Sequence, residues 1–189
     1  MHLEFAILLG VALSLLIYLL RTSQPPLISV VPDPRSETRK TTEWVPGYAE
    51  CPQLKILRIG GSIYFGAVDH VAAGLDELRE AHPEQRHLLL YAKSVNFVDV
   101  AGAELLAQEA AKRREGGGRL YLYSLRQSAR EVLEKGGYLQ KIGEENVFLT
   151  KKEAIATVFD RLDRDICARC RARIFLECRS LPPVRDPAS

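Results

Sequence analysis

Phe97-Val98-Asp99-Val100-Ala101-Gly102 lies where a strand of this chain turns into a helix. The apolar run at residues 87–92 precedes it, and apolar residues with helical spacing follow it at residues 103–114. An Asp at a helix N-cap accepts a hydrogen bond from a free backbone N–H, which stabilises a helix by about 1 kcal/mol. Helix N-termini also attract anionic groups. The candidate binding site is therefore Asp99, Val100, Ala101 and Gly102.

Strands and helices alternate along the rest of the chain. The predicted strands cover residues 54–59, 62–65, 87–92, 119–124 and 147–149, and the predicted helices cover 68–81, 103–114, 127–135 and 152–164. Gly60-Gly61 is interpreted as a hairpin turn between the first two strands. Strands that alternate with short helices indicate an α/β fold with a mixed, mostly parallel sheet and crossover helices.

Composition restricts the function. The chain has 189 residues, with 26 Lys and Arg against 24 Asp and Glu, for a net charge of +2. A nucleic-acid binder usually carries a strong basic excess, so no nucleic-acid partner is expected. The histidines lack metal-ligand spacing, Gly60 to Gly66 lacks the pattern of a phosphate-binding loop, and no catalytic constellation is visible. We therefore expect a protein that is not an enzyme.

The N-terminus carries a dense apolar block at residues 5–20. As a helix it would be about 24 Å long, close to the roughly 30 Å of a bilayer core once the flanking residues are added. A transmembrane helix over residues 1–21 is favoured over a signal peptide or a buried helix, because no convincing cleavage site follows. Positive charges after the helix place the remainder of the chain in the cytoplasm.

Residues 22–52 are rich in proline, which blocks both helix and sheet, so this segment is predicted to be a linker. The domain that follows is expected at residues 53–164. A tail with cysteine and arginine covers residues 165–189.

The tail contains Cys167, Cys170 and Cys178, which form a candidate metal site for zinc or another metal. Zinc needs a fourth ligand, for which Cys51 is a candidate, and one straight helix would hold Cys167 and Cys178 too far apart along its axis. A turn between Arg171 and Arg173 is therefore required. The alternative is a set of reduced or redox-responsive thiols, whose pKa the nearby arginines would lower.

The order of elements, with Phe97 to Gly102 at a strand-to-helix junction, resembles a STAS domain over residues 54–164. This module is shared by sulfate permeases and anti-sigma-factor antagonists. In the antagonists a phosphorylated Ser follows the Asp, and Val100 occupies that position here. The resemblance therefore implies a site without the phosphorylation switch.

The apolar helix, the proline-rich segment and residues 51–67 are similar to the end of a SulP-family sulfate permease. This implies a regulatory STAS module on the inner (cytoplasmic) membrane, single-pass, with the domain in the cytoplasm. Its expected partners are the membrane, the transmembrane part of a permease or another cytoplasmic protein, and a nucleotide. One membrane helix cannot enclose an anion route, so transport by this chain alone is not expected. The alternatives are a partner-switching protein that resembles anti-sigma-factor antagonists and a metal or redox sensor.

Overall fold

A six-stranded sheet in the order β2-β1-β3-β5-β7-β8 forms the centre of the domain. The computed structural model describes residues 2–36 and 38–183. The strands are β1 Leu27–Pro32, β2 Thr41–Glu43, β3 Leu54–Ile59, β5 His87–Tyr91, β7 Leu120–Tyr123 and β8 Val147–Phe148. Strands β3, β5, β7 and β8 pair in parallel, whereas β1 pairs antiparallel with both β2 and β3. The predicted mixed, mostly parallel sheet is confirmed.

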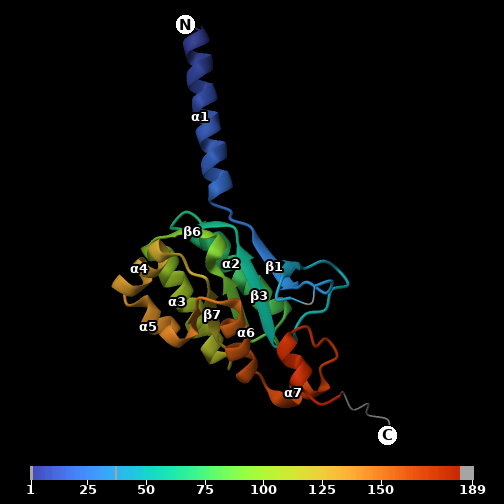
Figure 1. Ribbon diagram of the computed structural model, residues 1–189. Coiled ribbons are helices and arrows are strands. Elements are labelled where there is room, and N and C mark those ends of the chain that lie inside the picture. Colours follow the sequence, from blue (N-terminus) through green and yellow to red (C-terminus); the bar gives the residue numbers. More distant parts are fainter. Residues whose placement is uncertain (1, 37, 184–189) are drawn as a thin grey trace.

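Helices cover both faces of this sheet (Figure 1). Four helices pack on one face: α2 Val68–Ala81, α3 Val100–Glu115, α4 Gln127–Lys135 and α5 Tyr138–Ile142. Helix α6 Lys151–Asp160 packs on the other face, together with α7 Arg164–Arg169 and the short 3-10 helix η3 Leu176–Ser180. The predicted helices at residues 68–81 and 127–135 are confirmed.

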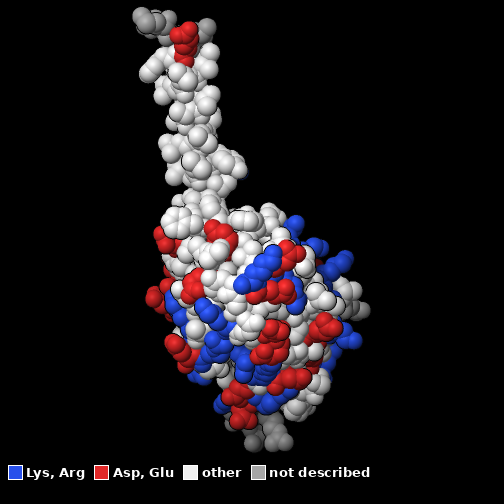
Figure 2. Space-filling model, turned by 90° about the vertical axis from the view of Figure 1, so that its left-hand side faces the viewer, with Lys and Arg blue, Asp and Glu red and all other residues white. Residues whose placement is uncertain are grey.

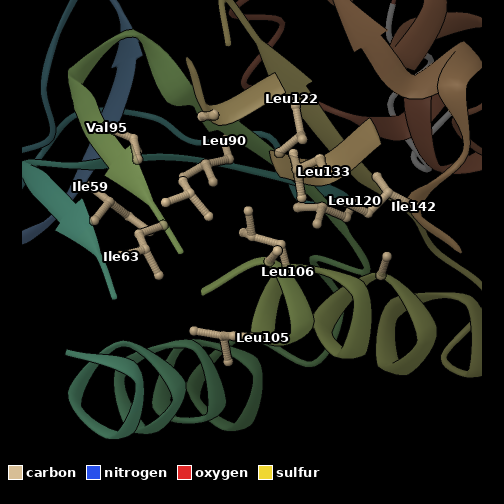
Figure 3. Close-up of a cluster of buried hydrophobic side chains, with 14 of the residues drawn as sticks. Ile59, Ile63, Leu90, Val95, Leu105, Leu106, Leu120, Leu122, Leu133 and Ile142 are labelled. Atoms are coloured by element: carbon tan, nitrogen blue, oxygen red, sulfur yellow. The ribbon is translucent and has the colours of Figure 1, made fainter. Parts of the chain in front are cut away.

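The two faces follow from the two-residue period of the strands. In β5, Leu88 and Leu90 belong to the core under α2 to α5, while Leu89 and Tyr91 belong to the core under α6 and the tail. Figure 3 shows how α3 joins the first of these cores: Leu106 points toward the sheet, and Leu105 points toward α2. Both leucines of α3 are buried, and burial of one such side chain contributes about 2 kcal/mol.

Residues 22–52 are not only a linker. The expectation that proline excludes strands from this segment is wrong, because β1 and β2 form one side of the sheet. Pro25 and Pro26 precede β1, and Pro32 is its last residue. The missing proline N–H groups therefore fall at the boundaries of the strand and leave its ladder intact.

The predicted hairpin at Gly60-Gly61 is also wrong. Strand β4 Gly61–Ile63 does not return along β3, but pairs in parallel with β6 Val95–Val98 in a separate two-stranded sheet. Gly61 has a φ of +132°, which a residue with a side chain rarely adopts. This backbone conformation redirects the chain away from β3 and carries it toward the junction at Asp99.

Helix α1 His2–Thr22 stands away from the domain (Figure 1). Residues Glu4–Thr22 have a mean hydropathy of 2.1 and none of them is buried. Figure 2 shows a surface without charge along most of α1, whereas Lys, Arg, Asp and Glu are mixed over this face of the domain. By length and composition, α1 can cross a bilayer.

Candidate functional site

Asp99 caps helix α3 as the sequence predicts. Its backbone is extended, with φ −99° and ψ −173°, and its Oδ1 accepts a hydrogen bond from the Gly102 N–H at 2.8 Å. Helix α3 begins at Val100, three residues earlier than predicted. The cap therefore fixes the direction in which α3 leaves β6.

The other carboxylate oxygen of Asp99 holds a second segment of the chain. Oδ2 accepts a hydrogen bond from the Phe65 N–H at 2.9 Å. Phe65 lies in the loop between β4 and α2, and this contact spans 34 residues of sequence. A single carboxylate thus connects the β6–α3 junction to the β4–α2 loop, a role that local sequence patterns do not predict.

Gly102 allows α3 to start close to its neighbours. A Cβ atom at this position would lie 2.1 Å from the backbone oxygen of Ile63. That same oxygen accepts a hydrogen bond from the Asp99 N–H at 3.3 Å. A side chain at residue 102 would therefore push α3 away from β4.

An exposed apolar surface flanks the capped carboxylate. Phe65 is 82% exposed, Val100 66% and Phe97 51%. We call these three residues the apical patch. Large apolar side chains that gather on a surface mark sites of protein or membrane contact, and sequence patterns identified only Val100 among the three.

The predicted binding residues divide between surface and interior. Val100 is exposed, Asp99 and Ala101 are half-buried, and Gly102 is buried. Gly102 can therefore contribute to a contact only by shaping the backbone. Phe65 and Phe97 supply the apolar area that the sequence prediction missed.

The apical patch lies next to the C-terminal end of α1. The Tyr64 hydroxyl donates a hydrogen bond to Oγ1 of Thr22 at 3.3 Å. Thr22 is the last residue of α1, and Tyr64 precedes Phe65. The surface of a bilayer that α1 spans would therefore lie next to the apical patch.

The tail cysteines gather at a different place. Helix α7 ends at Arg169, and Arg173 has a φ of +40°, so the chain turns near the place that the sequence requires. A small cavity on the α6 side of the sheet is lined by residues that include all four cysteines of the chain: Cys51, Cys167, Cys170 and Cys178. The structure thus brings Cys51 to the tail.

The four cysteines do not form a set of metal ligands among the described residues. Among the described residues, no group of three or more His, Cys, Asp or Glu side chains is placed to hold a metal ion. Burial raises the pKa of the Cys51 thiol to about 12 and also raises the pKa of Cys167 and Cys178. Arg164 lowers the pKa of Cys167 and Arg173 lowers that of Cys178, as expected, but desolvation outweighs their charge and the net change is upward. Zinc binding at Cys167, Cys170 and Cys178 stays a prediction.

Comparison with known proteins identifies the class of this α/β domain. The family model described as the STAS domain matches residues 46–154, and the chain belongs to this family. A putative sulfate transporter of Bacillus subtilis is 25% identical over 99 residues, which cover 52% of this chain and 18% of that protein. High affinity sulfate transporter 2 of Stylosanthes hamata is 24% identical over 165 residues, which cover 82% of this chain and 25% of the transporter.

Solved structures share the fold. The murine Solute Carrier 26 family member A9 anion transporter gives a TM-score of 0.66 at 17% identity, covering 82% of this chain and 26% of that chain. A sulfate transporter family protein from Wolinella succinogenes gives a TM-score of 0.51 at 24% identity, covering 68% and 97% of the two chains. The chain thus carries a STAS domain with homology to SulP sulfate transporters, and it spans at most about a quarter of the length of the curated relatives described above.

Proposed function

We propose that this chain is the cytoplasmic regulatory STAS module of a SulP-type inorganic anion transporter, and that it does not transport anions alone. Its family and its sulfate-transporter relatives support this proposal. Helix α1 would hold the module on the inner membrane in a single pass. Arg21 near the end of α1 favours a cytoplasmic domain, because basic residues are enriched on that side.

The observation that carries the proposal is the position of the apical patch. Phe65, Phe97 and Val100 are exposed around a carboxylate that fixes their two segments, and the Tyr64–Thr22 hydrogen bond places them beside the end of α1. An apolar surface at this place suits the membrane part of the transporter as its partner. Movement of the domain against that part would regulate the flow of anions.

Partner switching by phosphorylation has less support. Residues 100 and 101 are Val and Ala, which lack a hydroxyl group. Ser94 is the nearby serine, and its Oγ donates to the backbone oxygens of Ile59 at 2.8 Å and Tyr91 at 3.3 Å. A phosphate on Ser94 would break these bonds in the middle of the domain.

The test is sulfate uptake by cells that make the transporter together with this chain. We expect Phe65→Ser to change the uptake rate at equal abundance in the membrane. Leu149→Ser is the matched control, because Leu149 is 76% exposed and lies in the loop between β8 and α6. Equal uptake with both variants would contradict a regulatory role for the apical patch.

Membrane topology is tested in the same cells. A protease added to inverted inner-membrane vesicles should digest the domain, whereas the protease added to intact spheroplasts should not. The opposite pattern would place the domain outside the cytoplasm. The purified chain in lipid vesicles should show no sulfate flux, and flux by the chain alone would contradict the modular role.

A further inference from the structure

A cavity of about 320 Å³ lies on the face of the sheet that α6 and the tail cover. Three segments that are distant in sequence form most of its wall: residues 31–34, 36 and 38–41 around the β1–β2 connection, the start of α6, and tail residues 172–176. Tyr91 of β5 also lines it. The cavity therefore exists only when the tail is folded against the domain.

Basic side chains outnumber acidic ones in the described wall of this cavity. The five basic residues are Arg39, Lys40, Lys151, Arg173 and Arg179, against the single carboxylate of Asp33. Arg39 is neutralised by Glu177, with 2.5 Å between Nη2 and Oε1. The remaining positive charge favours an anion in the cavity.

Lys151 is the basic residue of this group that lies over the Tyr91 ring. Its Nζ donates to the backbone oxygen of Arg39 at 2.8 Å and to Oγ1 of Thr41 at 3.3 Å, and it lies 5.3 Å from the centre of the Tyr91 ring. Within residues 2–36 and 38–183, no carboxylate forms an ion pair with Lys151. Desolvation accordingly lowers the pKa of Lys151. A bound anion would supply the missing negative charge.

Tyr91 supplies the second observation that points to a ligand. The residue is 8% exposed, and its buried hydroxyl forms no hydrogen bond of good geometry among the described residues, although the Thr41 hydroxyl lies near it. Burial raises the pKa of Tyr91, and the neighbouring Thr41 hydroxyl offsets that rise only in part. A buried donor without a well-formed hydrogen bond is costly and rare in native proteins. An oxygen atom of a ligand would satisfy it.

We propose that this cavity binds a small anion with a tetrahedral oxyanion group, with the Lys151 ammonium and the Tyr91 hydroxyl as donors. Sulfate, inorganic phosphate and the phosphate of a nucleotide share this chemistry. The cavity volume is at the lower end of the range for ligand sites, so it also has room for part of a nucleoside. Because the site lies apart from the apical patch, the proposal stands independently of the regulatory role.

Isothermal titration calorimetry of the full chain in detergent tests the proposal. Sodium sulfate, sodium phosphate and AMP are titrated separately, with the ionic strength held constant by sodium chloride. We expect one binding site per chain for at least one probe. Heat from sulfate or phosphate would identify a bare oxyanion as sufficient, and heat from AMP alone would identify a nucleotide. Absence of binding by all three probes would overturn the proposal.

Two variants and a matched control locate the site. Lys151→Gln should weaken binding by roughly tenfold, because it removes a charge-assisted hydrogen bond. Lys152→Gln should leave the affinity unchanged, because Lys152 is the exposed neighbour on the same helix. Equal loss or equal retention of affinity in these two variants would show a non-specific effect of charge and overturn the site.

Tyr91→Phe keeps the test valid if Lys151→Gln fails to fold. Removal of an unpaired hydroxyl should leave the thermal midpoint of the free protein unchanged or raise it. The anion that binds should then raise the midpoint of the wild type more than that of Tyr91→Phe. An equal rise in both proteins would remove the hydroxyl from the site and overturn the proposal as stated.

Discussion

Asp99 should contribute to stability through two separate hydrogen bonds. Its Oδ1 caps α3 at Gly102, and its Oδ2 holds the Phe65 N–H. Loss of an N-cap costs about 1 kcal/mol. A hydrogen bond from an exposed N–H to a carboxylate contributes about 1 kcal/mol more. Asp99→Ala should therefore lower the free energy of unfolding by about 2 kcal/mol.

Two comparison variants separate these bonds. Asp99→Asn retains one carbonyl oxygen, and Asn is as good an N-cap as Asp, so this change should cost about 1 kcal/mol. Thr150 caps α6 with one hydrogen bond, from the Glu153 N–H to Oγ1 at 3.2 Å. Thr150→Ala should therefore also cost about 1 kcal/mol and serve as the single-bond control.

Urea unfolding of the full chain in detergent, followed by circular dichroism, measures these differences. Hydrogen exchange at the Phe65 amide adds a local readout, and this exchange should accelerate in Asp99→Ala and remain unchanged in Thr150→Ala. If Asp99→Ala costs no more than Thr150→Ala, or if exchange at Phe65 is unaffected, the carboxylate does not connect the two segments.

Three further changes have definite outcomes. Gly102→Ala should destabilise the domain by about 2 kcal/mol or more, because its Cβ would meet the Ile63 oxygen. Gly116→Ala is the control and should be tolerated in the same urea assay, because a Cβ at residue 116 would have no neighbouring atom closer than 3.6 Å. Burial lowers the pKa of His87 from 6.5 to about 4. As the pH falls from about 6.5 toward 4, the unfolded state therefore binds more protons than the folded state. The free energy of unfolding drops accordingly, by about 1 kcal/mol at pH 5. His87→Gln should lose that part of the pH dependence, and an unchanged slope would contradict the assignment. Alkylation of the native protein should label Cys170, the half-exposed thiol, before the three buried ones; equal labelling of all four by mass spectrometry would contradict the burial.

The sequence predicts the parallel part of this fold because its signals are local. The run at His87–Tyr91 is mostly apolar and is buried at every position, as expected for a strand covered on both faces. The apolar spacing of Val71 and Leu75 likewise marks the buried side of α2. Such patterns need no knowledge of what the element packs against.

The antiparallel side of the sheet has no comparable local signal. Strand β1 lies between prolines and β2 has only three residues. Strand β1 is stabilised by pairing with β3, and β2 by pairing with β1. Gly61 carries the chain away from the predicted hairpin through a backbone angle that the sequence does not reveal. Tertiary pairing decides both features, which is why local propensity misses them.

Part of the candidate site is readable from sequence and part is not. An Asp before a helical pattern indicates the cap, so the role of Asp99 in α3 was predictable. Its bond to Phe65 joins residues that only the fold brings together. The basic cavity around Lys151 has the same character, because its wall comes from three separated segments.

The central claim is that the apical patch faces the membrane part of a SulP-type transporter, and photo-cross-linking tests it most directly. A benzophenone amino acid is placed at residue 65 or, as a control, at residue 149, in cells that make the transporter with this chain. The account predicts a cross-link from residue 65 to the membrane part and none from residue 149. Cross-links from residue 149 alone, or none from residue 65 at matched abundance, would contradict it.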